Sequence, residues 1–99
     1  PGPRSWWKSA SGYKYVENKN DQATVNAIGP GYAIFMETQA GVFTGKEHVN
    51  FIKTKNVDAR GNGTIDTLDS NAKVKGRTYT VTNWAVTGTS YPVRGFGGH

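Results

Sequence analysis

Turn-forming residues recur at short intervals along this chain, and the segments between them are short. Glycine, proline, asparagine and aspartate mark the ends of these segments, as they do in most protein turns. Between the turns, apolar and polar residues alternate or form brief apolar runs, which are the patterns of half-buried and fully buried strands. The segments expected to form strands are 12–16, 23–28, 32–38, 42–44, 48–54, 64–67, 73–84 and 85–91. No stretch shows convincing helical amphipathicity, so the pattern predicts an all-β, mostly antiparallel small barrel or sandwich of about six to eight short strands.

The length of the chain limits it to one small domain. Its 99 residues suffice for one modest hydrophobic core, and hydrophobic residues make up 35% of them. Aromatic residues, at 12%, add a large buried area per side chain. We expect a flexible N-terminal arm over residues 1–11, a single β domain over 12–94 and a short tail over 95–99.

The charge of the chain indicates which partners suit it. A formal net charge of +5 and an isoelectric point near 9.7 favour anionic partners, with nucleic acid and acidic glycans as the leading candidates. The absence of cysteine excludes a disulfide scaffold and a thiolate zinc site, and no cofactor is expected. No apolar run reaches the length of a membrane span and no targeting segment is visible, which leaves a secreted or virion-surface location open. Nothing in the sequence fixes the oligomeric state.

Basic residues recur at spacing two in two of the expected strands, which places them on one face of a regular sheet. Aromatic rings close to such cations would suit a nucleic acid, because cations contact phosphates and exposed rings stack on unpaired bases. This combination predicts a non-enzymatic binding module for an anionic polymer, with single-stranded nucleic acid as the first choice of ligand. The residues expected to bind are Lys53, Lys55, Lys73, Lys75 and Arg77, with Trp6, Trp7 and Trp84 as stacking rings. The alternative is a solvated basic face, with the aromatic residues needed for the core.

Two other functions stay open at the level of sequence. The Trp6–Trp7 pair, with strands rich in asparagine and threonine, is compatible with a secreted or virion-surface domain that binds glycans or another protein. A small metal-independent ribonuclease is the third hypothesis, with His48 as the base, one of Lys53, Arg60 and Arg77 stabilising the phosphorane, and Tyr91 as the proton donor. These residues would have to converge in space, and a lone histidine is more often a surface or packing residue.

The stretch DARGNGTIDTLD, residues 58–69, spaces oxygen-bearing side chains in the manner of a calcium-binding loop. It resembles an EF-hand loop, in which positions one, five, nine and twelve correspond here to Asp58, Asn62, Asp66 and Asp69. Arg60 occupies position three, where the ion needs an oxygen ligand, and the flanking segments have the pattern of strands rather than helices. We therefore expect a tight turn between two strands, capped by Asp58, with a weak divalent-metal site as the minor alternative.

Overall fold

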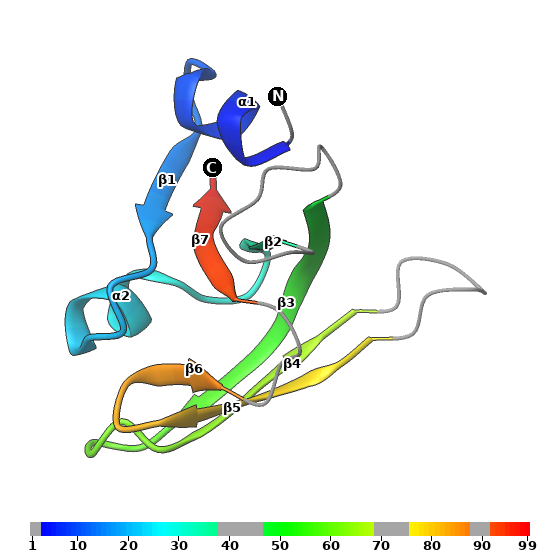
Figure 1. Ribbon diagram of the computed structural model, residues 1–99. Helices are drawn as coiled ribbons and strands as arrows, with labels where there is room; N and C mark the ends of the chain where they lie inside the picture. Colours follow the sequence, from blue (N-terminus) through cyan, green and yellow to red (C-terminus); the bar gives the residue numbers. More distant parts are fainter. Residues whose placement is uncertain (1–2, 38–46, 69–75, 88–91) are drawn as a thin grey trace.

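The chain folds around one antiparallel sheet that curls into a half-barrel (Figure 1). The computed structural model describes residues 3–37, 47–68, 76–87 and 92–99. The strands are β1 (Lys14–Glu17), β2 (Ala33–Glu37), β3 (Glu47–Val57), β4 (Gly63–Thr67), β5 (Thr78–Thr82), β6 (Ala85–Thr87) and β7 (Val93–Gly98). They lie in the order β1-β7-β2-β3-β4-β5-β6, and the pairings described are all antiparallel. This architecture confirms the predicted small all-β fold; the expected strand 42–44 lies outside the described residues.

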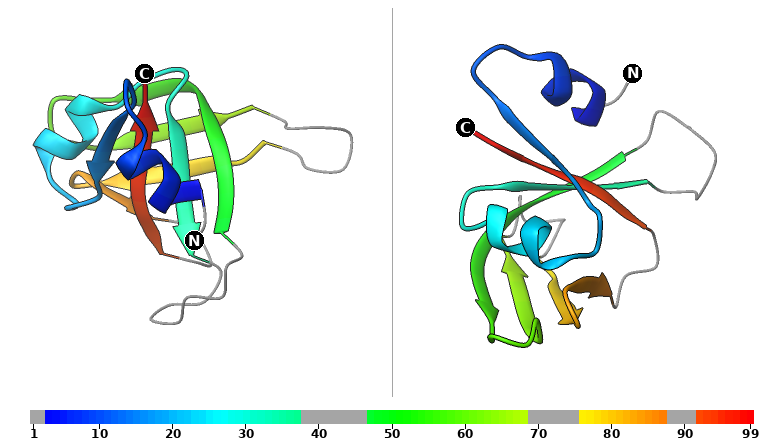
Figure 2. Two further views of the ribbon diagram at one scale, coloured as in Figure 1. Left: turned by 90° about the horizontal axis from the view of Figure 1, so that it is seen from above. Right: turned by 90° about the vertical axis from the view of Figure 1, so that its left-hand side faces the viewer.

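The hydrophobic core fills the concave side of the curled sheet, and the short helix α2 (Gln22–Ala27) adds to it (Figure 2). Alternation decides which side chains enter: Tyr79 and Val81 are buried, whereas the threonines on either side of each are exposed. The buried members of the core are Val25, Ile28, Ile34, Met36, Ile52, Ile65, Tyr79, Val81, Val93 and Phe96. Burial also raises the pKa of Tyr79. The side-chain amide of Asn50 donates a hydrogen bond to the Tyr79 hydroxyl, which lowers this pKa by a smaller amount.

Residues 23–28 were wrongly predicted as a strand, because they form α2 and its C-terminal cap. Asp21 caps the helix: its Oδ1 accepts hydrogen bonds from the backbone N–H and the hydroxyl of Thr24, at 2.9 and 2.7 Å. These bonds hold the pKa of Asp21 below its usual value. Val25 and Ile28 both reach the core, and a strand would have sent residues three apart to opposite faces. The capping aspartate and this spacing were the signals for a helix.

The N-terminal residues form helix α1 (Pro3–Ser9), where the sequence suggested a flexible arm. The helix packs on the convex side of the sheet. The Trp7 ring meets the Phe35 ring edge-on, with 5.5 Å between the ring centroids. Phe35 alternates with Ile34 and Met36, the core residues of β2, so its ring lies on the side opposite the core. Trp7 Nε1 also donates a hydrogen bond to the Gly98 carbonyl, at 3.1 Å. The expected tail differs as well, because β7 runs to Gly98 between β1 and β2. Of the helices described, none is long and apolar enough to cross a membrane.

Tyr15 joins α1 to the first strand. Arg4 Nε donates to the Tyr15 hydroxyl at 2.9 Å, and this hydroxyl donates in turn to the Glu17 carboxylate at 2.7 Å. Burial is the main reason why the pKa of Tyr15 rises to about 12, and the bond to Glu17 adds to the effect. The ring stacks on Phe35, so α1, β1 and β2 share one aromatic cluster on the convex side.

Candidate functional site

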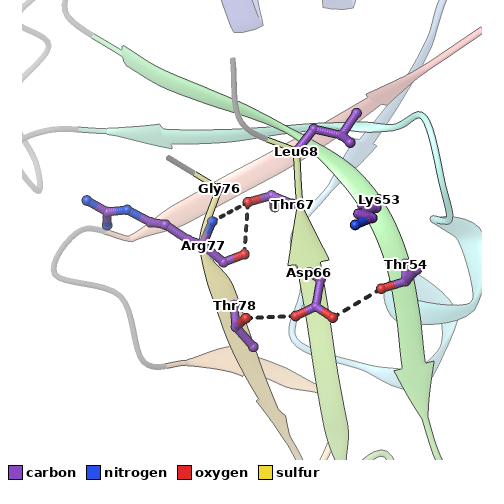
Figure 3. Close-up of a pocket in the computed structure, with 8 residues that line it drawn as sticks. All are labelled: Lys53, Thr54, Asp66, Thr67, Leu68, Gly76, Arg77 and Thr78. Atoms are coloured by element: carbon purple, nitrogen blue, oxygen red, sulfur yellow. Dashed lines mark hydrogen bonds between the residues drawn. The ribbon is translucent and has the colours of Figure 1, made fainter. Parts of the chain in front are cut away.

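An open hollow of about 730 Å³ lies on the convex side of β3, β4 and β5 (Figure 3). Two of the cations predicted to bind line it: Lys53 belongs to β3, and Arg77 immediately precedes β5. They stand on opposite sides of β4, and both are exposed. The remaining lining residues are Thr54, Asp66, Thr67, Leu68, Gly76 and Thr78. The structure thus brings part of the predicted basic surface together.

Three side chains in the middle of the hollow form a polar row across the strands. Asp66 pairs with Thr54 of β3 on one side and with Thr78 of β5 on the other. Its carboxylate accepts a hydrogen bond from the hydroxyl of each threonine, at 3.2 Å from Thr54 and 2.7 Å from Thr78 (Figure 3). These hydrogen bonds hold the Asp66 carboxylate between the two threonines. Its negative charge therefore lies on the strand between those that carry the two cations.

Lys55 does not belong to this surface, although the sequence placed it beside Lys53. The register of β3 against β4 shifts between Ile52 and Thr54, so Lys53 is the extra residue of a β-bulge. The bulge turns Lys55 inward, where its Nζ donates to the carbonyls of Val25 and Ile28, at 2.8 and 2.7 Å. A cation at the C-terminal end of α2 gives the last carbonyls of the helix a charged donor, in addition to the bond that the Val25 carbonyl accepts from the Ile28 N–H. Lys55 therefore has a structural role.

Replacing Lys55 with methionine is expected to lower the free energy of unfolding by about 2 kcal/mol, because two partly buried helix carbonyls lose a charged donor. Lys53→Met is the matched control, since Lys53 is exposed and should change stability by less than about 0.5 kcal/mol. Urea unfolding of the two variants measures the difference. Equal stability of both variants would contradict the structural role of Lys55.

Two exposed apolar residues, Phe51 of β3 and Leu68 directly after β4, lie next to each other, and Leu68 lines the hollow. Phe51 is 42% exposed and Leu68 is 48% exposed. Leu68 donates a backbone hydrogen bond to the Phe51 carbonyl at 2.9 Å, which makes the two residues cross-strand neighbours on one face. Leu68 lines the hollow, and Phe51 is its neighbour on the adjacent strand, just outside the set of lining residues. Phe51 was not among the residues predicted to bind, although its alternation with the buried Asn50 and Ile52 indicated that it lies on the opposite, exposed face.

The three tryptophans lie away from the hollow. Trp7 packs between α1 and the sheet, and Trp6 is 56% exposed on the same helix. Trp84 occupies the second position of the two-residue turn between β5 and β6, with φ of +69°, and its ring rests on Gly61 of the preceding turn. The predicted meeting of tryptophans and lysines on one surface is therefore not found in the described residues.

The loop-like stretch 58–63 is a tight turn. Asp58 Oδ1 accepts hydrogen bonds from the backbone N–H groups of Arg60 and Asn62, at 2.8 and 3.0 Å. Asn62 Oδ1 accepts from the Asn83 N–H of the neighbouring turn, at 2.9 Å. Two of the oxygens suggested for a metal thus hold backbone groups, while Asp66 faces the hollow. Within the described part of the chain, which leaves out Asp69, no cluster of three or more acidic or histidine side chains could hold a metal ion.

The residues proposed for a nuclease are not brought together where the structure describes them. His48 lies near the start of β3, and Arg60 lies in the turn beyond its end. Nine residue steps separate His48 from Val57, or roughly 30 Å of strand at ~3.3 Å per residue. Tyr91, like Lys73 and Lys75, lies outside the described residues.

Comparisons of the chain with protein-family models, with curated proteins and with solved structures found no match. The chemistry of the hollow itself is therefore the basis for assigning a function.

Proposed function

We propose that this protein is a non-enzymatic binding module for single-stranded nucleic acid, and that the hollow on β3, β4 and β5 is its contact surface. The observation that carries the proposal is the pair of exposed cations, Lys53 and Arg77, on opposite sides of one open hollow. Each cation can replace a counterion on a phosphate, which is the main source of affinity for nucleic acids. Arg77 can also hold a phosphate with two parallel hydrogen bonds.

The local charge supports an anionic ligand rather than a cationic one. Among the described residues that line the hollow, two carry a positive charge and one, Asp66, carries a carboxylate, and the whole chain has a net charge of +5.

The Phe51 ring supports a single strand over a duplex. Bases stack on exposed aromatic faces only when they are unpaired, and such a contact contributes about 1–3 kcal/mol per base. We assign to Phe51 the stacking role that the sequence suggested for the tryptophans, because Phe51 is exposed and pairs with Leu68, which lines the hollow.

The salt dependence of binding tests this proposal. We expect a fluorescent single-stranded oligonucleotide to bind at low ionic strength, with an affinity that falls steeply as salt is added. In the variant Lys53→Ser/Arg77→Ser, the slope of log affinity against log salt should decrease by about 1.4, because each phosphate contact on a single strand contributes about 0.7. Fluorescence anisotropy titrations at several salt concentrations measure the slope.

A second double variant controls for net charge. Lys14→Ser/Lys19→Ser removes two exposed cations from β1 and from the segment before α2, neither of which lines the hollow. Its salt slope should stay close to that of the unchanged chain. Equal slopes in the two double variants would mean that the charge of the whole molecule, and not this hollow, attracts the ligand; no binding at low salt would refute the proposal.

A second candidate function, the binding of an uncharged glycan, is favoured by the exposure of Trp6. Its ring lies 5.1 Å from the ring of Tyr13, which is 36% exposed, so two aromatic faces reach solvent at the end of the molecule that carries α1. Pyranose rings stack on such faces. Glycan binding of this kind would be insensitive to salt, would fall in Trp6→Ala and would be unchanged in Lys53→Ser/Arg77→Ser.

A further inference from the structure

The middle of the hollow presents hydrogen-bond acceptors, whereas its two sides present donors. An ionised carboxylate only accepts, so the hydroxyls of Thr54 and Thr78 donate their protons to Asp66. The remaining lone pairs of these three side chains can then only accept further bonds. Lys53 and Arg77, on either side, carry donors and no acceptors. A complementary ligand has a hydroxyl donor in its middle and anionic oxygens on both sides.

We infer that this surface binds RNA in preference to DNA and that Asp66 is the residue that distinguishes the sugars. The inference rests on the proposed function and adds the class of nucleic acid to it. The ribose 2′-hydroxyl supplies a donor between successive phosphates, and it is the group by which proteins tell RNA from DNA. Deoxyribose has no such donor, so DNA would bring phosphates close to the Asp66 charge with no compensating hydrogen bond.

The spacing across the sheet suits a strand of RNA that crosses β3, β4 and β5. Lys53 and Arg77 lie two strands apart, or roughly 10 Å at ~4.8 Å per strand, with Asp66 on the strand between them (Figure 3). The Arg77 side chain extends away from β4 in Figure 3, and rotation of this exposed side chain would bring its guanidinium to a phosphate on one side of a ribose held at Asp66, with Lys53 at the phosphate on the other side. Two residues along β4 from Asp66, Leu68 and its neighbour Phe51 are placed to receive the adjoining base.

An acidic glycan also combines hydroxyls with anionic groups. The Phe51 ring favours RNA, because a nucleobase offers a flat π face for stacking and each such contact strengthens binding to an unpaired strand. Acidic glycan is therefore the competing ligand that the experiment has to exclude.

The experiment compares oligo-uridylate with oligo-deoxyuridylate of equal length at low salt, for the full chain and for Asp66→Asn. We expect the unchanged chain to bind the RNA about tenfold more tightly, as one hydrogen bond to a charged acceptor allows. Asparagine can keep one threonine contact through its oxygen and the other through its N–H groups, so the polar row persists. Loss of the negative charge should strengthen DNA binding, and the ratio of RNA to DNA affinity should fall severalfold.

Two further variants separate sugar recognition from charge and from overall affinity. Asp58→Asn removes the same charge from a turn that does not line the hollow, and it should leave the affinity ratio unchanged. Phe51→Leu removes the ring beside the hollow, and it should weaken RNA and DNA binding by a similar factor. Urea unfolding of each variant confirms that the fold is retained.

A tenfold preference for RNA that falls in Asp66→Asn but not in Asp58→Asn supports the inference. Equal binding of RNA and DNA by the unchanged chain overturns the inference. A preference for RNA that persists in Asp66→Asn overturns it as well. In both cases the proposed function still holds. No binding of either oligonucleotide refutes the proposed function itself. Heparin and unlabelled RNA are also compared as competitors, with both concentrations counted in anionic charges. If heparin displaces the bound RNA at a much lower concentration than unlabelled RNA does, the assignment is overturned in favour of an acidic glycan.

Discussion

Replacing Gly63 with alanine is expected to lower the free energy of unfolding by about 3 kcal/mol. Gly63 opens β4 and pairs with Val57 on one side and Val81 on the other. A Cβ atom on Gly63 would fall on the carbonyl oxygen of Asn56, which belongs to the backbone of β3 and cannot rotate away as a side chain would. Because strands on both sides hold the position, the clash has to be relieved by distorting the backbone of β3 and β4 where their hairpin begins. Urea unfolding of the variant measures the loss.

Gly29→Ala is the matched control for this substitution. A Cβ atom on Gly29 would meet no other atom within 4 Å, and its backbone has an ordinary negative φ. Alanine there should leave stability unchanged or raise it slightly, because it restricts the unfolded chain. If Gly63→Ala proved as stable as Gly29→Ala, the close approach of β3 and β4 described here would be incorrect.

Trp7→Ala should lower the free energy of unfolding by a similar amount, about 3 kcal/mol, at the lower end of the range for buried tryptophans because the ring is only partly buried. The ring fills the space above Gly97, meets Phe35 and Tyr13 edge-on, and donates to the Gly98 carbonyl. Without it, α1 loses its main contact with the sheet. Seven residues are too few for a helix to persist on its own, so the helical circular dichroism signal should fall as well.

The neighbouring tryptophan provides the control. Trp6→Ala removes a ring of the same size from the same helix, but this ring is 56% exposed and contacts only Trp7 and Tyr13 among the ring pairs described. Its cost should be below about 1 kcal/mol. A loss as large as that of Trp7→Ala would show that the two rings contribute equally, contrary to the packing of α1.

The local sequence was sufficient to predict the strands whose two faces differ. In β5, the alternation of threonine with Tyr79 and Val81 gave both the strand and its buried face. Local signals also predicted the turn at Asp58. Aspartate, asparagine and glycine favour turns, and the Asp58 carboxylate accepts hydrogen bonds from two backbone N–H groups there. At α2, the sequence contained the capping signal of Asp21, and short-range alternation was the misleading pattern.

Features that depend on distant residues could not be predicted in this way. The docking of α1 requires Gly97, at the opposite end of the chain, to leave room for Trp7. Likewise, the pattern of Lys53 and Lys55 suggested one face, and only the pairing of β3 with β4 shows the bulge that separates them. For this reason the sequence identified Lys53 and Arg77 as candidates but did not single out Phe51, since exposure is decided by the sheet as a whole.

The position of β7 has a consequence for how the protein matures on the ribosome. In the sheet described, β1 pairs only with β7, although nearly the whole of this sequence separates the two. The first strand therefore has no strand to pair with, and Trp7 of α1 lacks its Gly98 acceptor, until the last strand has left the exit tunnel. Such dependence on contacts distant in sequence is associated with slow folding. The nascent chain should thus hold its N-terminal aromatic residues exposed, within reach of chaperones, until translation of this region is complete.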